Sequence, residues 1–263
     1  MNPAARIFLS GAQRRLLAHG WGVFVFHKVA PTPPQTRDPF EYTSPRTLDQ
    51  RLAALRGAGF QPATLDDLHR KPARLEKPFV VTFDDGYAHL VDTPLILETL
   101  ARQGVSATVF LVAGKLGAAN DWDILKGDVP EKLMNVAQVK TWLAAGHRIG
   151  SHSLTHANFR RISPDEARGE ILDSKKKLED TFGVAVNDFC YPFGRYFPFH
   201  LEQLAEAGYR TGCTMRFGVY REPESLLEIP RLAAYSALEL TRKAWHRCRR
   251  RLAFRAGAGN RRT

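Results

Sequence analysis

The sequence has little cysteine and no long apolar run. Its 263 residues include only Cys190, Cys213 and Cys248, and no C-x-x-C pair occurs. A small, odd number of cysteines without metal-type spacing is typical of free thiols in a reducing compartment, not of a disulfide framework. No uninterrupted apolar stretch approaches the ~20 residues that a membrane-spanning helix needs.

Acidic residues are missing from both ends of the chain. Residues 1–37 hold five Lys/Arg and no acid, and residues 240–263 hold nine and no acid. The two ends together therefore carry a formal charge of +14. Because the net charge of the whole chain is +11, residues 38–239 carry −3. A groove that grips nucleic acid usually spreads basic residues through the body of the protein, so we expect no specific nucleic-acid partner.

The basic ends have an amphipathic pattern. Residues 237–254 place Leu238, Trp245, Cys248 and Leu252 on one side of a helix, and residues 4–18 show a weaker version. Such helices suit an anionic membrane surface, although a solvated tail is the alternative. We expect basic segments at 1–20 and 237–263 to flank one domain at 21–236.

The amino-terminal end lacks a secretory signal. Its opening apolar run is only residues 7–9, and Arg14 and Arg15 follow soon after. This pattern predicts a cytoplasmic protein, bound peripherally to the inner face of the cell membrane if the basic ends bind lipid.

Short β-rich runs alternate with helical stretches. The expected strands are Gly22–Phe26, Phe79–Phe83, Ser106–Val112, Arg148–Ser151, Asn187–Tyr191, Tyr209–Thr214 and Leu227–Leu232. The expected helices are Ser44–Ala58, Leu90–Gln103, Asn135–Ala145, Ser163–Phe182 and Pro198–Ala207, each followed by a glycine suited to end it. This α/β alternation predicts a parallel sheet with helices outside, and seven or eight units favour a closed barrel.

Chemically versatile side chains follow the strands at their carboxyl ends. These residues are His27, Asp84, Asp85, His152, His156 and Arg231. In barrels of this class the active site forms where the carboxyl ends meet the loops. We therefore expect these side chains to share one end of the barrel.

The spacing of His152 and His156 indicates a metal site. If the segment turns helically, residues four apart lie on one face and can bind one ion. One carboxylate from Asp85 or Asp84 would complete a two-histidine, one-carboxylate set. Taken separately, the histidine pair fits a solvated helix face and Asp-Asp-Gly fits a turn, but their joint placement at strand ends favours the site.

Two motifs resemble those of the polysaccharide deacetylases, carbohydrate esterase family 4. They are TFDDGY at residues 82–87 and GHRIGSHSLTH at residues 146–156, and the resemblance covers about residues 20–235. It implies a distorted (β/α) barrel of about seven parallel strands and removal of acyl groups from amino sugars. It also implies that Asp84 is the base, and that Asp85, His152 and His156 bind a divalent metal. Zinc suits these ligands best, with nickel, cobalt and manganese as alternatives.

The chain departs from the common family pattern in two places. The third motif usually begins with an arginine that steadies the base, and Cys190 stands there instead. We hypothesise that Arg231 substitutes for it from a neighbouring strand end. The late motif with the acid histidine is also missing. Phe26-His27-Lys28-Val29 instead resembles the biofilm poly-N-acetylglucosamine deacetylases, which implies that His27 is the acid.

Three further residues are assigned to the substrate pocket. The resemblance places the oxyanion-binding backbone N–H at Phe193 and a substrate contact at Tyr191. Trp122 lies in a long connection, residues 113–135, where it either stacks on a sugar ring or packs the loop onto the body. Cys190 is either a thiolate ligand or a small packing residue.

We therefore expect a metal-dependent hydrolase that removes N-acetyl groups from the amino sugars of an envelope polysaccharide or its lipid-linked precursor. Deformylation or O-deacetylation of a lipid-linked sugar would use the same residues. A glycan-binding module with a decayed site is a further alternative, because the usual arginine of the third motif is absent.

Overall fold

A computed structural model describes residues 15–70 and 75–233 of the chain. Its strands are β1 (Gly22–Phe26), β2 (Gln61–Ala63), β3 (Pro78–Phe83), β4 (Thr108–Leu111), β5 (Arg148–Ser151), β6 (Asp188–Cys190), β7 (Thr211–Phe217) and β8 (Ile229–Ala233). Its α-helices are α3 (Pro45–Gly57), α4 (Leu65–Arg70), α5 (His89–Asp92), α6 (Pro94–Arg102), α7 (Asp121–Ile124), α8 (Val136–Ala144), α9 (Pro164–Phe182) and α10 (Phe199–Glu206). Short 3-10 helices are η1 (Pro39–Glu41), η2 (Ala113–Lys115), η3 (Pro192–Gly194) and η4 (Leu226–Glu228).

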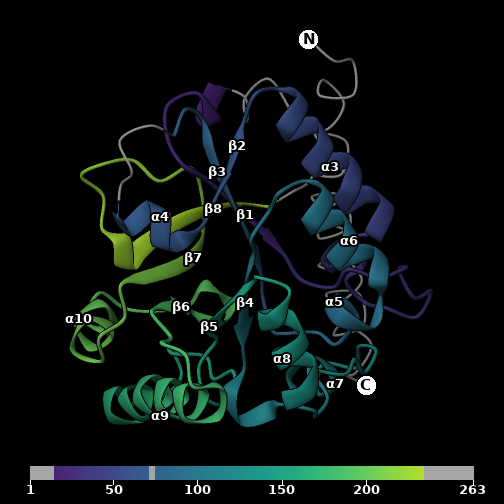
Figure 1. The fold of residues 1–263 in the computed structure, drawn as a ribbon. Coiled ribbons are helices and arrows are strands. Elements are labelled where there is room, and N and C mark those ends of the chain that lie inside the picture. Colours follow the sequence, from purple (N-terminus) through teal and green to yellow (C-terminus); the bar gives the residue numbers. More distant parts are fainter. Residues whose placement is uncertain (1–14, 71–74, 234–263) are drawn as a thin grey trace, which may run out of the picture.

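Seven parallel strands close into a barrel, as predicted. The order runs β1-β8-β7-β6-β5-β4-β3, and β3 pairs with β1 to close the ring (Figure 1). β2 lies outside the ring against the first half of β3, which leaves the second half to pair with β4. The barrel is distorted, because β5 and β6 share only the pair Ser151↔Phe189 and the register of β7 and β8 shifts.

Successive side chains of each strand point to opposite faces, so the barrel has two separate hydrophobic cores. Val23, Val80 and Cys213 belong to a buried cluster inside the barrel, together with two leucines of α4, the helix at the amino ends of the strands. The neighbouring residues Phe24 and Val81 belong to a larger cluster between the strands and the helices outside. Both faces of the strands are therefore buried, which explains their near-continuous apolar sequences.

The helix signals in the sequence are confirmed. Ser163 begins α9 with a capping box, in which its side chain accepts from the Glu166 N–H and Glu166 reaches back to the Ser163 N–H. The glycines expected to follow helices all have positive φ: Gly59, Gly104, Gly146, Gly183 and Gly208. Helices α3 and α6 pack together on one side of the barrel, and α9 and α10 pack together on another (Figure 1).

One expectation about local structure was wrong, and some elements were missed. The helix expected at residues 90–103 is divided into α5 and α6 at Thr93 and Pro94, because proline lacks the N–H that would continue the helix and disfavours helical backbone before it. The elements β2 and α4 were not foreseen.

The amphipathic helices expected at the two ends lie almost entirely outside the described residues. Within residues 15–70 and 75–233, no helix combines the length and the apolar character needed to cross a bilayer.

Candidate active site

All the residues selected from the sequence line one cavity at the carboxyl ends of the strands. The cavity measures about 480 Å³. The selected residues are His27, Asp84, Asp85, Trp122, His152, His156, Tyr191, Phe193 and Arg231. They come from elements far apart in the sequence, so the barrel topology brings them together.

Asp84 leaves β3 in a fixed orientation. Its N–H donates to the Phe26 carbonyl at 2.9 Å, which continues the pairing of β3 with β1. Arg231 of β8 donates from Nη1 to Oδ1 and from Nη2 to Oδ2, both at 2.7 Å. Burial would raise the pKa of Asp84, but the charge and hydrogen bonds of Arg231 hold that pKa below its ordinary value. Asp84 is thus a buried, ionised and rigidly held carboxylate.

Asp85 turns away from Asp84 and faces two imidazoles. Its φ of 71° allows adjacent carboxylates to point into different parts of the cavity. Asp85 Oδ1 lies 3.3 Å from Nε2 of His152 and 3.3 Å from Nε2 of His156. Burial alone would raise the pKa of Asp85, but the two histidines keep it well below the ordinary value.

The three side chains fit a divalent cation. One donor atom from each of Asp85, His152 and His156 lies within 4.8 Å of the others, and all three residues are buried. The Nδ1 atom of His152 is 2.7 Å from the Cys190 carbonyl, so Nδ1 donates a proton to that carbonyl and Nε2 is the ring nitrogen available to an ion beside Asp85. Such a second contact is the usual way in which a protein orients a metal-binding imidazole.

The histidines converge through a bend and not through the helical turn that we considered. Between them, Ser153 has a φ of 65°, and His156 itself has a φ of 66°. The Ser153 hydroxyl accepts from the His156 N–H at 3.0 Å, and Glu170 of α9 accepts from the N–H groups of Leu154 and Thr155 at 2.9 and 2.8 Å. The four-residue spacing correctly indicated that the two histidines lie together, but the Ser153 hydroxyl and Glu170 of α9 hold the bend that brings them together.

His27 directly follows the end of β1 and lies beside Asp84. Its Nε2 is 3.7 Å from Asp84 Oδ2, and its side chain is 23% exposed. It is therefore more open to the cavity than the two other histidines, whose side chains are 3% and 4% exposed. The His27 imidazole therefore lies beside the Asp84 carboxylate and also lines the cavity.

A model of the polysaccharide deacetylase family matches residues 71–212. This span includes more than half of the chain and both carboxylates and metal-type histidines. The chain belongs to the polysaccharide deacetylase family. It is 31% identical over 122 residues to the peptidoglycan-N-acetylglucosamine deacetylase PgdA of Listeria monocytogenes, a match that covers 46% of this chain and 22% of that protein.

Solved structures confirm the fold. IcaB from Ammonifex degensii superposes with a TM-score of 0.71 at 21% identity, covering 87% of this chain and 97% of that one. The deacetylase PplD of Streptococcus pyogenes, solved with acetate, gives 0.69 at 20% identity and covers 85% and 97%. The chain spans about half or less of these curated relatives: the matches cover 53% of the putative polysaccharide deacetylase YxkH of Bacillus subtilis and 22% of PgdA.

Cys190, which stands where the family pattern has an arginine, contacts both the Asp84–Arg231 ion pair and the metal-type histidine His152. The Cys190 sulfur accepts from Arg231 Nη2 at 3.1 Å and lies 3.6 Å from Asp84 Oδ2, while its carbonyl accepts from His152. Burial raises the pKa of the Cys190 thiol to about 11, so it is a neutral thiol packed against the ion pair. Asp84, His152 and Cys190 form a second group close enough to hold an ion, although a protonated thiol is a poor ligand.

Aromatic side chains surround His156. The Trp122 ring lies 4.1 Å from the His156 ring, and the Phe193 ring meets it edge-on at 4.5 Å. Trp122 is only 9% exposed and packs in a buried cluster, and it also lines the cavity. Tyr191 is fully buried and donates to the Leu227 carbonyl. Phe193 has a φ of 59°, which marks a constrained turn at the predicted oxyanion donor.

A buried lysine that the sequence did not reveal supports the wall of the cavity. Lys28, next to His27, is 0% exposed and donates to Glu41 at 3.0 Å and to Asp123 at 3.3 Å. Asp123 belongs to α7, beside Trp122, so Lys28 ties the end of β1 to the segment that covers His156. The sequence around Lys28 gives no sign that its side chain pairs with Asp123, which lies 95 residues away.

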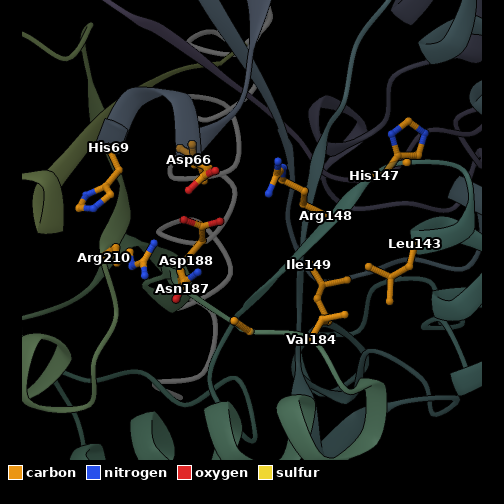
Figure 2. Close-up of a pocket in the computed structure, with 13 residues that line it drawn as sticks. Asp66, His69, Leu143, His147, Arg148, Ile149, Val184, Asn187, Asp188 and Arg210 are labelled. Carbon is orange, nitrogen blue, oxygen red and sulfur yellow. The ribbon is translucent and has the colours of Figure 1, made fainter. Parts of the chain in front are cut away.

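A second cavity, of about 320 Å³, lies at the opposite end of the strands. Figure 2 shows the carboxylates of Asp66 from α4 and Asp188 from β6 pointing toward each other, with Arg148 beside them. Burial and the charge of Asp66 raise the pKa of Asp188 to about 6. Among the described residues, the groups able to hold an ion all lie at the other end, so we place the chemistry there.

Proposed function

We propose that the protein is a metal-dependent hydrolase that removes N-acetyl groups from the amino sugars of an envelope polysaccharide or its lipid-linked precursor. The observation that carries this proposal is that the adjacent carboxylates of Asp84 and Asp85 have different partners. Arg231 holds Asp84 apart, while Asp85 faces the two histidines. A site of this kind has one carboxylate for a cation and another for a proton.

The proposed metal ligands are Asp85, His152 and His156. A bound divalent cation, for which zinc is our first choice, supplies Lewis acidity toward an amide carbonyl and lowers the pKa of coordinated water. Nickel, cobalt and manganese suit the same donors.

The chain's own residues would handle the protons. Asp84 would accept a proton from the attacking water, with its plane fixed by the Arg231 fork. His27 would donate a proton from Nε2 to the departing amine, because imidazole gains and loses protons near neutral pH. The backbone N–H of Phe193 would stabilise the oxyanion, and one such donor is typically worth ~3–4 kcal/mol.

The active-site arrangement favours an enzyme over a decayed binding module. The third motif lacks its arginine, yet Asp84 has a bidentate arginine partner from β8. The buried cluster of Asp85 and two histidines also has no evident use in a module that only binds glycans. Relatives named for peptidoglycan and chitin deacetylation support N-acetylated amino sugars as the substrate class.

The test is acyl release from free and lipid-linked N-acetyl sugars, with zinc and with a chelator. We expect acetate with zinc, none with chelator, and none from the Asp84→Asn variant. Formate from an N-formyl sugar in place of acetate would assign the deformylase alternative. A zinc-loaded protein that releases no acyl group from any member of the panel would overturn the proposal.

We also propose that the protein acts in the cytoplasm, attached to the inner face of the cell membrane through its basic ends. The nine basic residues and no acids at 240–263 support this, since each Lys or Arg near an anionic surface contributes ~1 kcal/mol. Flotation with anionic liposomes should recover the full chain and much less of a chain truncated after Leu240. Equal flotation of the two would remove the role of the tail.

A further inference from the structure

The catalytic cavity continues into a second hollow on the same face. This adjoining hollow measures about 500 Å³ and shares Phe193, Arg195 and Met215 with the catalytic cavity. Its other lining residues are Arg160, Gly194, Tyr196, Pro198, Thr214, Arg216 and Glu228. A sugar chain whose acetyl group lies at the metal-type cluster can therefore extend over these shared residues into the hollow.

The adjoining hollow is cationic. It contains three arginines and one acid, Glu228, whose carboxylate accepts from the Tyr196 hydroxyl. Arg160 donates to the Tyr196 carbonyl at 2.9 Å, and Arg216 pairs with Glu224 at 3.2 Å. All three arginines are exposed, but Arg195 differs from the other two because no other described residue engages its guanidinium in a hydrogen bond or ion pair. It stands at the junction of the two hollows.

Four acids that line the catalytic cavity with Arg195 already have hydrogen-bond partners. Glu41 and Asp123 both accept from Lys28, and Asp84 accepts from Arg231. The Asp38 carboxylate accepts from the Phe40 N–H at the start of η1. These carboxylates thus have hydrogen-bond partners of their own, whereas the Arg195 guanidinium has none among the described residues.

Exposed apolar side chains lie beside Arg195. Phe193 is 38% exposed, Met215 44% and Phe217 58%. The Lys126 ammonium, which pairs with Asp123 at 3.2 Å, lies 4.9 Å from the centre of the Phe193 ring. A flat apolar surface next to a guanidinium is suited to a sugar ring that carries an anionic group, because the ring stacks while the fork binds oxygen atoms.

We propose that the adjoining hollow is a subsite for an anionic group, phosphoryl or carboxylate, on the sugar next to the one that is deacetylated. Arg195 binds this group through its guanidinium fork. The inference rests on the proposed function and narrows its substrate class to anionic amino-sugar glycans, which include sugars linked through phosphate.

The test compares three disaccharides that differ in charge: N,N′-diacetylchitobiose, its 1-phosphate, and N-acetylglucosaminyl-N-acetylmuramic acid. Calorimetry measures their binding to the zinc-loaded protein at low salt. We expect at least one anionic disaccharide to bind about tenfold or more tightly than the neutral one, the range for a charge-assisted hydrogen bond. Preference for the phosphate or for the carboxylate identifies the group.

Variants then assign the preference to Arg195. R195Q should abolish it, and R195K should retain part of it, because lysine keeps the charge but not the fork. R70Q is the matched control, since Arg70 is an exposed arginine on α4 at the opposite end of the barrel, and it should leave the preference intact. Equal binding of neutral and anionic disaccharides, or a preference that survives R195Q, would overturn the inference.

Acetate release from all three disaccharides is measured on the same wild-type samples. Release without an anion preference rejects the subsite and keeps the proposed function. An anion preference that depends on Arg195 but comes with no acetate release from any disaccharide keeps the subsite and rejects the proposed function.

Discussion

Replacing Arg231 tests how the base is held. Its two contacts with Asp84 are 2.7 Å long, and the two side chains are 0% and 3% exposed. Breaking a buried ion pair leaves an uncompensated charge and typically costs ~3–5 kcal/mol of unfolding free energy. We expect Arg231→Met to lose about this amount in urea unfolding followed by tryptophan fluorescence.

The same variant should also lose turnover, since Asp84 is no longer fixed and a general base is typically worth ~10²–10⁴-fold. Arg231→Lys should recover part of the stability but little of the turnover, because an ammonium cannot hold both carboxylate oxygens. A double variant with Asp84→Asn should lose less stability than the two single variants together, since it buries no unpaired charge.

The reasoning about the base would be refuted by an Arg231→Met or Arg231→Ala protein with unchanged turnover. A loss of unfolding free energy below ~1 kcal/mol would equally contradict a buried pair, because that is the range of exposed salt bridges.

The remaining predictions concern the other titratable and metal-type groups. Asp84→Asn should retain zinc and lose acetate release, whereas His152→Ala should lose both, as measured by metal analysis and product assay. Asp188→Asn should stabilise the fold at pH 7.5 by about 1–3 kcal/mol. Burial raises the pKa of Asp188 to about 6, so the folded state loses stability as pH rises from about 4 to 6 and this carboxyl group has to ionise. Urea unfolding at pH 4 and at pH 7.5 should therefore show the gain only at the higher pH. The thiols of Cys190 and Cys213, with pKa values raised by burial to about 11 and about 12, should resist iodoacetamide at pH 8 until denaturant is added, as read by mass spectrometry.

Each of these outcomes can fail in a specific way. Equal zinc loss in Asp84→Asn and His152→Ala would mean that Asp84 is itself a ligand. Asp188→Asn should keep the contact with Thr211, because an amide oxygen can still accept from that hydroxyl, so a less stable variant at pH 7.5 would contradict the raised pKa. Rapid alkylation of native Cys190 would contradict its burial.

The sequence predicted most of the barrel because its strands are buried on both faces. The run GVFVF at Gly22–Phe26 and the run PFVVTF at Pro78–Phe83, which is apolar except for Thr82, are recognisable without knowing their partners. β2 is three residues long and contains Pro62, so it carries neither an apolar run nor a period to detect. The division of the helix at Pro94 was visible in the sequence, yet the apolar pattern on both sides of it suggested one helix.

The site was predicted in its residues more than in its geometry. Parallel strands place their carboxyl ends at one end of a barrel, which was enough to gather Asp84, Asp85, His152 and His156. The bend that brings the histidines together depends on Ser153 and Glu170, which have no distinctive spacing. The ion pair of Asp84 with Arg231 joins residues 147 apart, and only the hypothesis of a substitute arginine anticipated it.

The most direct test of the account is an anomalous-diffraction map at the zinc edge from crystals of the zinc-loaded protein. We predict one strong peak ~2.0–2.2 Å from Asp85 and from Nε2 of both His152 and His156, with Asp84 still on Arg231. A peak among Asp84, His152 and Cys190, or no peak near Asp85, would contradict the division of labour between the two carboxylates.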